Sequence, residues 1–309
     1  MVSIILPSYN EEKMIKIAAD TIGKLFTKEN IEYELIFVDD GSKDKTWQQI
    51  EEVSENDAHV IGVHFSRNFG KEAAMFAGLE AANGDCCVVM DCDLQHPPET
   101  AVEMYRLWEQ GYEVVEGVKS DRGKESAIHK LAANTFYGIM SKTSGFNMAD
   151  ASDFKLLDRK VVDALNNMKE RNVFFRALSH WAGFKKISVS YEVQERIEGQ
   201  SKWSTTSLIK YAIRNITSFS TGPMQIVTVL GAIMMVISVV LGTITLIQKF
   251  TGQSLEGFST VITVQLFSSS IIMISLGIIG VYISKIYEEV KGRPRYIVSK
   301  KVGDKKDDK

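Results

Sequence analysis

The stretch "VSIILPSYNEEKMIKIAADTIGKLF", residues 2–26, decides the fold class of the N-terminal part of the chain. It begins with an unbroken apolar run that ends at a proline and polar residues, a pattern typical of a strand buried on both faces. Apolar residues then recur at helical spacing. The same unit repeats three times, with strand-like runs at 33–42, 59–66 and 85–93 and helical runs at 45–55, 71–83 and 97–111.

This alternation predicts an α/β domain with a mostly parallel sheet and right-handed crossovers. Ligands of such sheets bind beyond the carboxyl ends of the strands. Four loops therefore hold the candidate functional residues, namely "PSYNEE", "DDGS", "SRNFGKE" and "DCDLQHPP". Further along, the pattern predicts a strand at 112–119, a helix at 127–145, and a strand that leads into a helix at 153–168.

Two long uncharged runs follow, at 215–248 and 257–284. Each covers the roughly 20 residues that a bilayer-spanning helix needs, so we expect transmembrane helices at about 225–247 and 261–283. The excess of Lys and Arg on their outer flanks predicts a cell-membrane protein with the large domain and both termini in the cytoplasm. The start, "MVSIILPSYN", lacks the basic residues and long apolar run of a signal peptide.

The expected organisation has four parts. We expect a cytoplasmic α/β domain at 1–203, an amphipathic helix on the inner leaflet at 204–222, a two-helix membrane hairpin at 223–284, and a basic cytoplasmic tail at 285–309. The last part of this tail, "KKVGDKKDDK" at 300–309, should be disordered. The formal net charge of -3 argues against a nucleic-acid partner. Serines and glycines of the second span could join subunits into a homo-oligomer, or the serines could bond within their own helix.

The stretch "MDCDLQHPPE" raises the question of a metal, because all three cysteines lie at 86–92. Side chains alternate along a strand, so Asp91 and Asp93 should share a face while Cys92 points the other way. Zinc would need converging Cys and His ligands, which adjacent cysteines do not supply. Two carboxylates at a strand mouth favour Mg²⁺ or Mn²⁺, and solvated loop carboxylates are the alternative.

The neighbouring loops add further candidates. Asp39 and Asp40 end a second central strand, where they could form an ordinary turn or accept hydrogen bonds from a base or ribose. Lys71 could contact a phosphate or be a solvated helix-start lysine. The loop before it fails the P-loop pattern, and no G-x-G-x-x-G follows the first strand, which weakens a dinucleotide-binding interpretation. His96 is a candidate pocket residue.

Several motifs together resemble those of family-2 glycosyltransferases of the polyprenyl-phosphate type, such as bactoprenol glucosyltransferases and dolichol-phosphate mannose synthases. These motifs are "PSYNE", "VDDGS", "SRNFGKEAA", "MDCDLQHPPE", "DFKLLDR" and "YEVQERIEGQSKW", with "YEEVKGRPRY" after the second span. The resemblance implies a GT-A nucleotide-sugar-binding, Rossmann-like fold. It also implies transfer of a hexose from a nucleotide sugar to polyprenyl phosphate, with inversion, on the cytoplasmic leaflet.

The resemblance assigns roles to the matching positions. Asp91 and Asp93 match the D-x-D motif, which holds the metal and the donor diphosphate, and Asp153 matches the carboxylate near the acceptor. The residues that match the loops around base and ribose in that family are Pro7, Ser8, Asn10, Glu11, Asp39 and Asp40. The matching R-x-x-G-x-S-K loop holds Arg196, Ser201 and Lys202, and we expect these with Lys119 and Arg122 to bind the acceptor phosphate. Family members often carry Arg at the position of Lys119, which leaves its acceptor-phosphate role open. Asp150 lies close to Asp153 in the chain, so either carboxylate could face the sugar.

The expected mechanism follows from the acceptor. A phosphate monoester has its second pKa near 6, so it is mostly dianionic and scarcely needs a general base. Asp153 could therefore be an orienting or electrostatic carboxylate as readily as a general base. Glucose or N-acetylglucosamine from a UDP donor is favoured, by analogy. A processive polysaccharide synthase is the nearest alternative, although "RALSHW" lacks its acceptor motif, and a catalytically relict membrane subunit is another.

Overall fold

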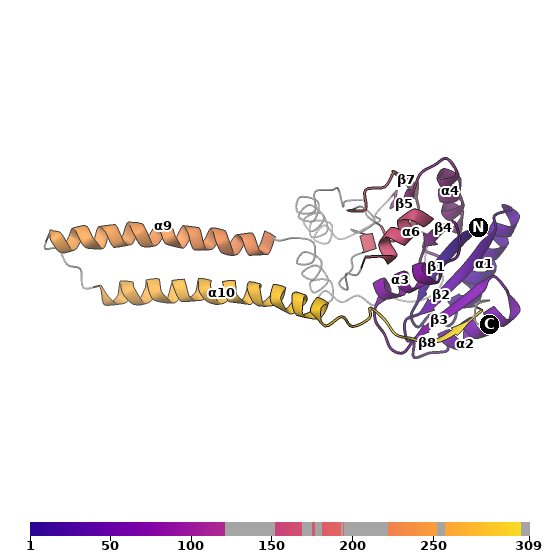
Figure 1. Ribbon diagram of the computed structural model, residues 1–309, viewed down its shortest axis with the longest axis horizontal. Coiled ribbons are helices and arrows are strands. Elements are labelled where there is room, and N and C mark those ends of the chain that lie inside the picture. The colour runs from indigo at the N-terminus through magenta and orange to yellow at the C-terminus, as the bar shows by residue number, and fades with distance from the viewer. Residues whose placement is uncertain are drawn as a thin grey trace. The chain divides into compact units, whose positions relative to one another are not determined.

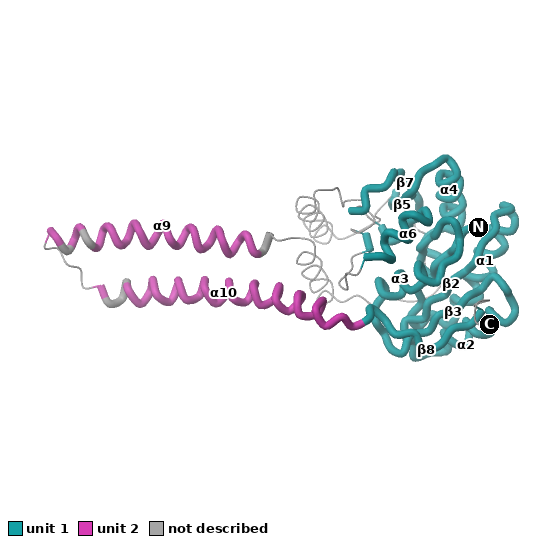
Figure 2. Tube along the Cα trace, in the orientation of Figure 1, with its two compact units in different colours: residues 1–207, 294–309 teal, residues 208–293 magenta. Residues whose placement is uncertain are grey.

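The computed structural model describes residues 1–120, 152–168, 175–176, 181–192, 194, 222–251 and 257–303. Two compact units divide the chain, the first with residues 1–207 and 294–309 and the second with residues 208–293 (Figure 2). The predicted helix at 127–145 lies outside the described residues, as does the predicted interfacial helix at 204–222 apart from its last residue.

The alternation of strands and helices predicted for the first unit is confirmed, with small differences at element ends (Figure 1). The elements in chain order are β1 Val2–Ser8, α1 Met14–Lys28, β2 Tyr33–Asp39, α2 Thr46–Asn56, β3 Val60–Phe65, α3 Lys71–Ala81, β4 Cys86–Val89, α4 Pro98–Glu109, β5 Val114–Lys119, β6 Lys155–Asp158, α6 Arg159–Asn166, β7 Lys186–Tyr191 and β8 Val298–Val302.

The strands form one mixed sheet in the order β7-β5-β6-β4-β1-β2-β3-β8. The central strands β4, β1, β2 and β3 are mutually parallel, as the crossovers predict. β6 runs antiparallel to β4 and β5, and β8 runs antiparallel to β3. The predicted α/β architecture with a mostly parallel sheet is therefore correct.

Helices cover both faces of the sheet. Alternate residues of β1, including Ile4 and Leu6, pack with α1 and α4 in one buried core, and α1 also contacts α2. On the other face α3 packs on β1 and β2 and contacts α6. At Gly78 of α3 a Cβ would lie 2.2 Å from Cγ2 of Ile5, so only glycine permits this close approach. This close packing fixes the position of α3, and therefore of its first residue Lys71, relative to β1.

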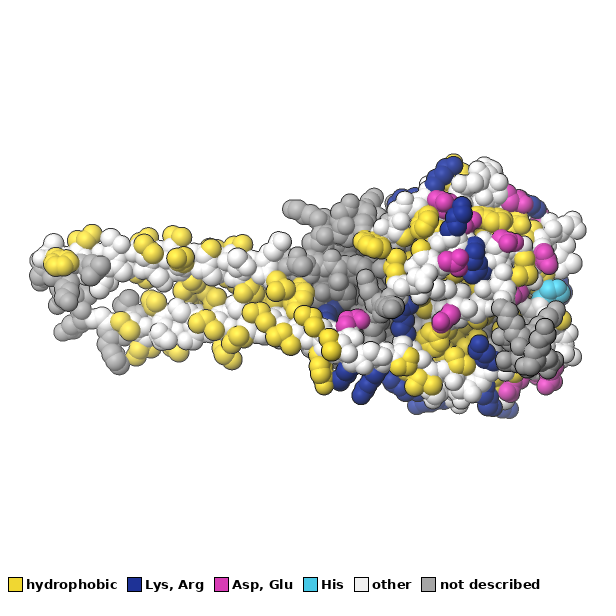
Figure 3. Space-filling view, in the orientation of Figure 1, with side chains coloured by type: hydrophobic (Ala, Val, Ile, Leu, Met, Phe, Trp, Pro, Cys, Tyr) yellow, Lys and Arg dark blue, Asp and Glu magenta, His cyan; other side chains and the backbone are white. Residues whose placement is uncertain are grey.

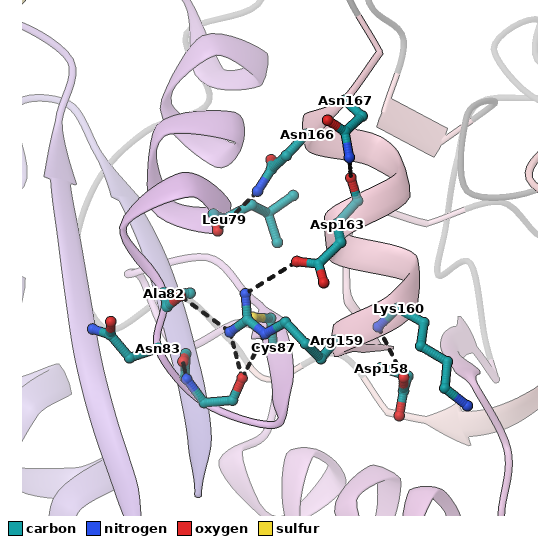
Figure 4. Close-up of polar contacts among 12 residues, drawn as sticks. Leu79, Ala82, Asn83, Cys87, Asp158, Arg159, Lys160, Asp163, Asn166 and Asn167 are labelled. Carbon is teal, nitrogen blue, oxygen red and sulfur yellow. Dashed lines mark hydrogen bonds and ion pairs between the residues drawn. The ribbon is translucent and has the colours of Figure 1, made fainter.

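Arg159 anchors α6 to the turn between α3 and β4 (Figure 4). Its Nε donates to the carbonyl of Gly84 at 2.9 Å, and Nη2 donates to the carbonyl of Ala82 at 3.1 Å. Near the other end of α6, Asn166 donates to the carbonyl of Leu79 at 3.2 Å. Hydrogen bonds at both ends thus hold α6 against α3.

The C-terminal tail is not wholly disordered, because residues 298–302 form β8. This strand covers the outer edge of β3, with Lys300 opposite His64 and Val302 opposite Gly62. The expectation of a disordered end is wrong for residues 300–302. The strand carries Lys300 and Lys301, and charged side chains, lysine above all, suit the exposed edge of a sheet. The first unit is thus built from two separate stretches of chain.

The second unit contains two long helices, α9 Gly222–Phe250 and α10 Phe258–Val290. Both are long and apolar enough to cross a membrane, over Met224–Thr245 and Val261–Val290. Their large apolar side chains are exposed rather than packed into a core, as Figure 3 shows along both helices. The expected hairpin therefore corresponds to two adjacent apolar helices in the structure.

Candidate active site

The carboxyl ends of β1, β2 and β4 bring the candidate loops together. Ser8 lies beside Asp39 in the pairing of β1 with β2, and Ile5 lies beside Val89 in the pairing of β1 with β4. The loop after β4 therefore lies next to the end of β1, and Asp91 is its second residue. This is the position at which parallel sheets bind ligands.

Asp91 and Asp93 are half-buried, whereas Cys92 between them is buried. The predicted separation of carboxylates from thiol is therefore confirmed, although its cause differs from the prediction. β4 ends at Val89, and residues 92–93 form a turn before Leu94, whose φ is +57°. A turn, rather than a continuing strand, therefore leaves the two carboxylates partly exposed and the thiol buried.

His96 holds this turn in place from behind. Its Nδ1 accepts a hydrogen bond from the Asp91 N–H at 3.0 Å, and its ring stacks on Phe154 with centroids 4.6 Å apart. Tyr191 packs edge-on against the same ring. Burial lowers the pKa of His96 and outweighs the opposing effect of Asp91, so the ring stays neutral and its Nδ1 can accept. His96 thus supports the site from the core.

Four charged side chains meet beside the turn. Lys71 Nζ lies 2.6 Å from an Asp91 oxygen and 3.3 Å from an Asp153 oxygen. Arg176 binds Asp153 with both arms of its guanidinium, Nε to Oδ1 and Nη2 to Oδ2, each at 2.8 Å. The cluster brings together Lys71 from the start of α3, Asp91 from the loop after β4, Asp153 from two residues before β6, and Arg176.

The cluster keeps its carboxylates ionised. Burial raises the pKa of Asp153, but Arg176 and Lys71 lower it by more, and the pKa falls well below its ordinary range. Burial also raises the pKa of Asp91, which Lys71 overcomes, so this pKa is lowered as well. Burial lowers the pKa of Lys71, but Asp91 and Asp153 raise it by more, so the ammonium stays charged. Asp153 is therefore a weak proton acceptor in this arrangement.

A second ion pair lies beneath Asp153. Lys155 and Glu116 are buried, and Lys155 Nζ donates to Glu116 Oε1 at 3.1 Å. The same oxygen accepts from the Ser152 N–H at 3.0 Å. Burial lowers the pKa of Lys155 more than Glu116 raises it, and its charge contributes to the low pKa of Asp153. The pair fixes the backbone on either side of Asp153.

Asp39 and Asp40 lie at the end of β2, buried and bonded within the protein. Asp39 accepts from the Ser42 N–H at 2.9 Å and lies 2.8 Å from Nδ1 of His64. Asp40 Oδ1 accepts from the Phe69 N–H at 2.6 Å, and Oδ2 accepts from the Gly70 N–H at 2.9 Å. Burial raises the pKa of Asp40 to about 6, against the effect of these two donors. Asp40 thus ties β2 to the loop that leads into Lys71.

The remaining loop candidates surround this edge of the sheet. Asn10, with φ of +55°, accepts from the Lys43 N–H at 2.9 Å, and the Glu11 N–H donates to Thr46 Oγ1 at 2.8 Å. Pro7 and Ser8 end β1, and the Ser8 side chain is buried. These bonds join the first loop to the loop after β2, so the structure brings together the residues expected around base and ribose.

The other candidates are divided between described and undescribed residues. Lys119 ends β5 with an exposed side chain and lies directly opposite Tyr191 of β7. Arg122, Asp150, Arg196, Ser201 and Lys202 lie outside the described residues. Arg176 was missed by the sequence reasoning. Its signal was weak, because a lone arginine in "VFFRALSH" has no motif spacing to Asp153.

The donor set fits a hard metal ion better than a soft one. Burial raises the pKa of the Cys87 and Cys92 thiols to about 12, so both stay protonated. Among the described residues, no group of three or more His, Cys, Asp or Glu side chains is arranged to enclose a metal. Mg²⁺ is usually bound by one or two carboxylates, with substrate phosphates and waters completing the shell. Asp91 and Asp93, two half-buried carboxylates in one turn, are donors of that kind, and their Oδ1 atoms already bind Lys71 Nζ at 2.6 Å and the Gln95 N–H at 3.1 Å.

Comparison with known proteins decides the family. Residues 3–165 match glycosyl transferase family 2. The chain belongs to this family. The glycosyltransferase is 41% identical over 305 residues to YkcC of Bacillus subtilis, an uncharacterized glycosyltransferase, covering 97% of this chain and 94% of that protein. It is 35% identical over 301 residues to the bactoprenol glucosyl transferase of Shigella phage SfII, covering 97% of each.

Solved structures support the expected GT-A fold of this glycosyltransferase. Mannosyl-3-phosphoglycerate synthase from Rubrobacter xylanophilus superposes with a TM-score of 0.50 at 16% identity, over 71% of this chain and 72% of that one. Glucosyl-3-phosphoglycerate synthase from Mycobacterium tuberculosis, solved with Mn²⁺, UDP and phosphoglyceric acid, gives a TM-score of 0.50 at 17% identity, over 70% and 78%. At these identities the likeness concerns the fold alone.

Proposed function

We propose that this glycosyltransferase moves a hexose, glucose or N-acetylglucosamine, from a UDP-linked sugar to polyprenyl phosphate on the cytoplasmic leaflet, with inversion at the anomeric carbon. The observation that carries the proposal is the 35% identity to bactoprenol glucosyl transferase over 97% of both chains. That extent includes α9 and α10, which would hold the enzyme at its lipid acceptor. The product would be a lipid-linked sugar donor for modification of cell-envelope glycans.

The donor would bind at the carboxyl edge of the sheet. Asp91 and Asp93 would hold Mg²⁺ or Mn²⁺ with the diphosphate, where the metal supplies Lewis-acid stabilisation of the leaving group. Base and ribose would be contacted by the first two loops, through Pro7, Ser8, Asn10, Glu11, Asp39 and Asp40. Lys71, already 2.6 Å from Asp91, would lie beside the diphosphate and offset its charge.

The acceptor phosphate would need positive charge more than a base. It is mostly dianionic at neutral pH, because its second pKa lies near 6. Asp153 is held ionised by Arg176 and Lys71, so its proposed role is to position these cations and to shape the field around the reacting atoms. Lys119, Arg122, Arg196, Ser201 and Lys202 are the proposed phosphate ligands. Both termini would lie in the cytoplasm, and the helices could support a homo-oligomer.

The test is a turnover assay in membranes that contain the full chain. Polyprenyl phosphate, a panel of UDP- and GDP-sugars and either Mg²⁺ or Mn²⁺ are added, and mass spectrometry identifies the lipid product. We expect one hexose on the lipid phosphate with a UDP donor, and loss of product with EDTA or in Asp91→Asn. Transfer unaffected by EDTA would contradict the proposed metal dependence. A lipid that carries a growing polymer would favour a processive synthase.

A further inference from the structure

The segment that follows the second apolar helix does more than complete the sheet. Arg295 and Tyr296, five and six residues after the end of α10 at Val290, contact elements that position the site. We infer that Arg295 and Tyr296 are positioning residues for glycosyl transfer. They hold α3 in place, and this keeps Lys71 and Arg176 in contact with the Asp153 carboxylate.

Arg295 joins α3 to the end of α6. Its guanidinium lies over the ring of Phe76 in α3, 4.5 Å from the centroid. The same guanidinium donates through Nη2 to the carbonyl of Met168, just after α6. A planar guanidinium can stack on a ring and donate in its own plane at the same time. One side chain therefore bridges the two helices on this face of the sheet.

The contact continues toward Asp153. Phe76 packs edge-on against Phe175, with ring centroids 6.1 Å apart. Phe175 is fully buried and directly precedes Arg176, which binds both oxygens of Asp153. A shift of Phe76 would therefore displace Phe175 and misalign the guanidinium of Arg176. Two bonds at 2.8 Å to one carboxylate tolerate little rotation, since both depend on the plane of the fork.

Tyr296 fixes α3 at both of its ends. Its ring stacks on Phe65, the last residue of β3, with centroids 4.9 Å apart and 13° between planes. Phe65 in turn packs edge-on against Phe69, which lies two residues before Lys71 and whose N–H donates to Asp40. The Tyr296 hydroxyl donates to Glu80, near the C-terminal end of α3. The start and end of the helix thus depend on a residue from the tail.

The experiment compares full-length variants in the membrane assay, so it rests on the proposed function for its substrates. The variants are Arg295→Met, Arg295→Lys, Tyr296→Leu and Tyr296→Phe. Lys300→Met is the matched control, because Lys300 belongs to the same tail but points to Glu51 at 3.8 Å, away from α3. For each variant kcat and the donor KM are measured, together with hydrogen exchange of peptides from α3, β1 and β2.

We expect Arg295→Met and Tyr296→Leu to lower kcat about tenfold with a donor KM within about twofold of wild type. Exchange should accelerate in α3 and not in β1 or β2. Arg295→Lys and Tyr296→Phe should recover part of the rate, because each keeps the contact with the aromatic ring. Lys300→Met should match wild type in both measurements.

Three outcomes would overturn the inference. These are an unchanged kcat in Arg295→Met, an unchanged exchange rate in α3, or equal acceleration in α3, β1 and β2, which would mean general destabilisation. Wild type inactive with every donor would instead count against the proposed function. In that case the exchange experiment still decides whether the tail holds α3.

Discussion

Arg176 determines how the Asp153 carboxylate can act. A carboxylate that accepts two charge-assisted bonds from one guanidinium has little tendency to take up a proton. Lys71 adds a further cation 3.3 Å away. The sequence identifies Asp153 from the motif around it, but the partner that sets its pKa is 23 residues away, in a segment without any motif. Only the packed structure reveals that pairing.

The first prediction concerns this carboxylate. Asp153→Asn should lower kcat by about 100-fold, because it removes the charge that aligns Arg176 and Lys71. Since the folded pKa of Asp153 is depressed, the group is charged throughout the neutral range, and the loss should be equal at each pH from about 6 to 9. The pH profile of kcat for wild type and variant checks this. A titration in wild type between these limits that vanishes in the variant would indicate a general base.

The turn after β4 shows how an element end creates a site. The strand stops at Val89, and the partial exposure of Asp91 and Asp93 depends on Leu94 in the left-handed region and on His96 behind the turn. The motif D-x-D predicted which residues would be partly exposed, since alternation and turn give the same result here. It did not predict the role of His96, which depends on Phe154 from a distant part of the chain.

The second prediction tests the support given by His96. His96→Leu removes the acceptor of the Asp91 N–H, and an unsatisfied buried donor costs about 1–3 kcal/mol. We therefore expect a lower thermal unfolding midpoint and weaker Mn²⁺ binding in the presence of UDP, measured by electron paramagnetic resonance. His96→Asn is the control, because its amide oxygen can accept the same hydrogen bond. Equal Mn²⁺ binding by the Leu and Asn variants would show that the turn does not need this acceptor.

The molecule as a whole is organised around a discontinuous unit. Residues 1–207 form the sheet together with residues 294–309, although the two long apolar helices separate them along the chain. The edge strand β8 covers the outer side of β3, which would otherwise present unpaired backbone groups. The helices and the sheet domain are therefore linked at both ends of the hairpin rather than at one.

The third prediction follows from this arrangement. Deleting residues 298–309 removes β8 and leaves Arg295 and Tyr296 in place. It should expose the edge of β3, and so lower the yield of soluble, detergent-extracted protein and abolish most of its activity. Deleting residues 304–309 leaves β8 intact and removes three Asp and three Lys residues, so the net charge is unchanged and the truncated protein should behave as wild type. Size-exclusion profiles and turnover of the two truncations check this. Equal behaviour of both would mean that β8 is dispensable.

Local patterns predicted most of the fold. Apolar runs, helical spacing and uncharged spans are properties of neighbouring residues, so they identified the central parallel strands, their helices and both apolar helices. The carboxylates at the strand ends followed from the same patterns. The grip of Arg176 on Asp153, the support from His96 and the return of the tail as β8 join residues far apart in the chain. Such contacts arise only when packing brings those segments together, so they cannot be predicted from the spacing of apolar residues within one segment.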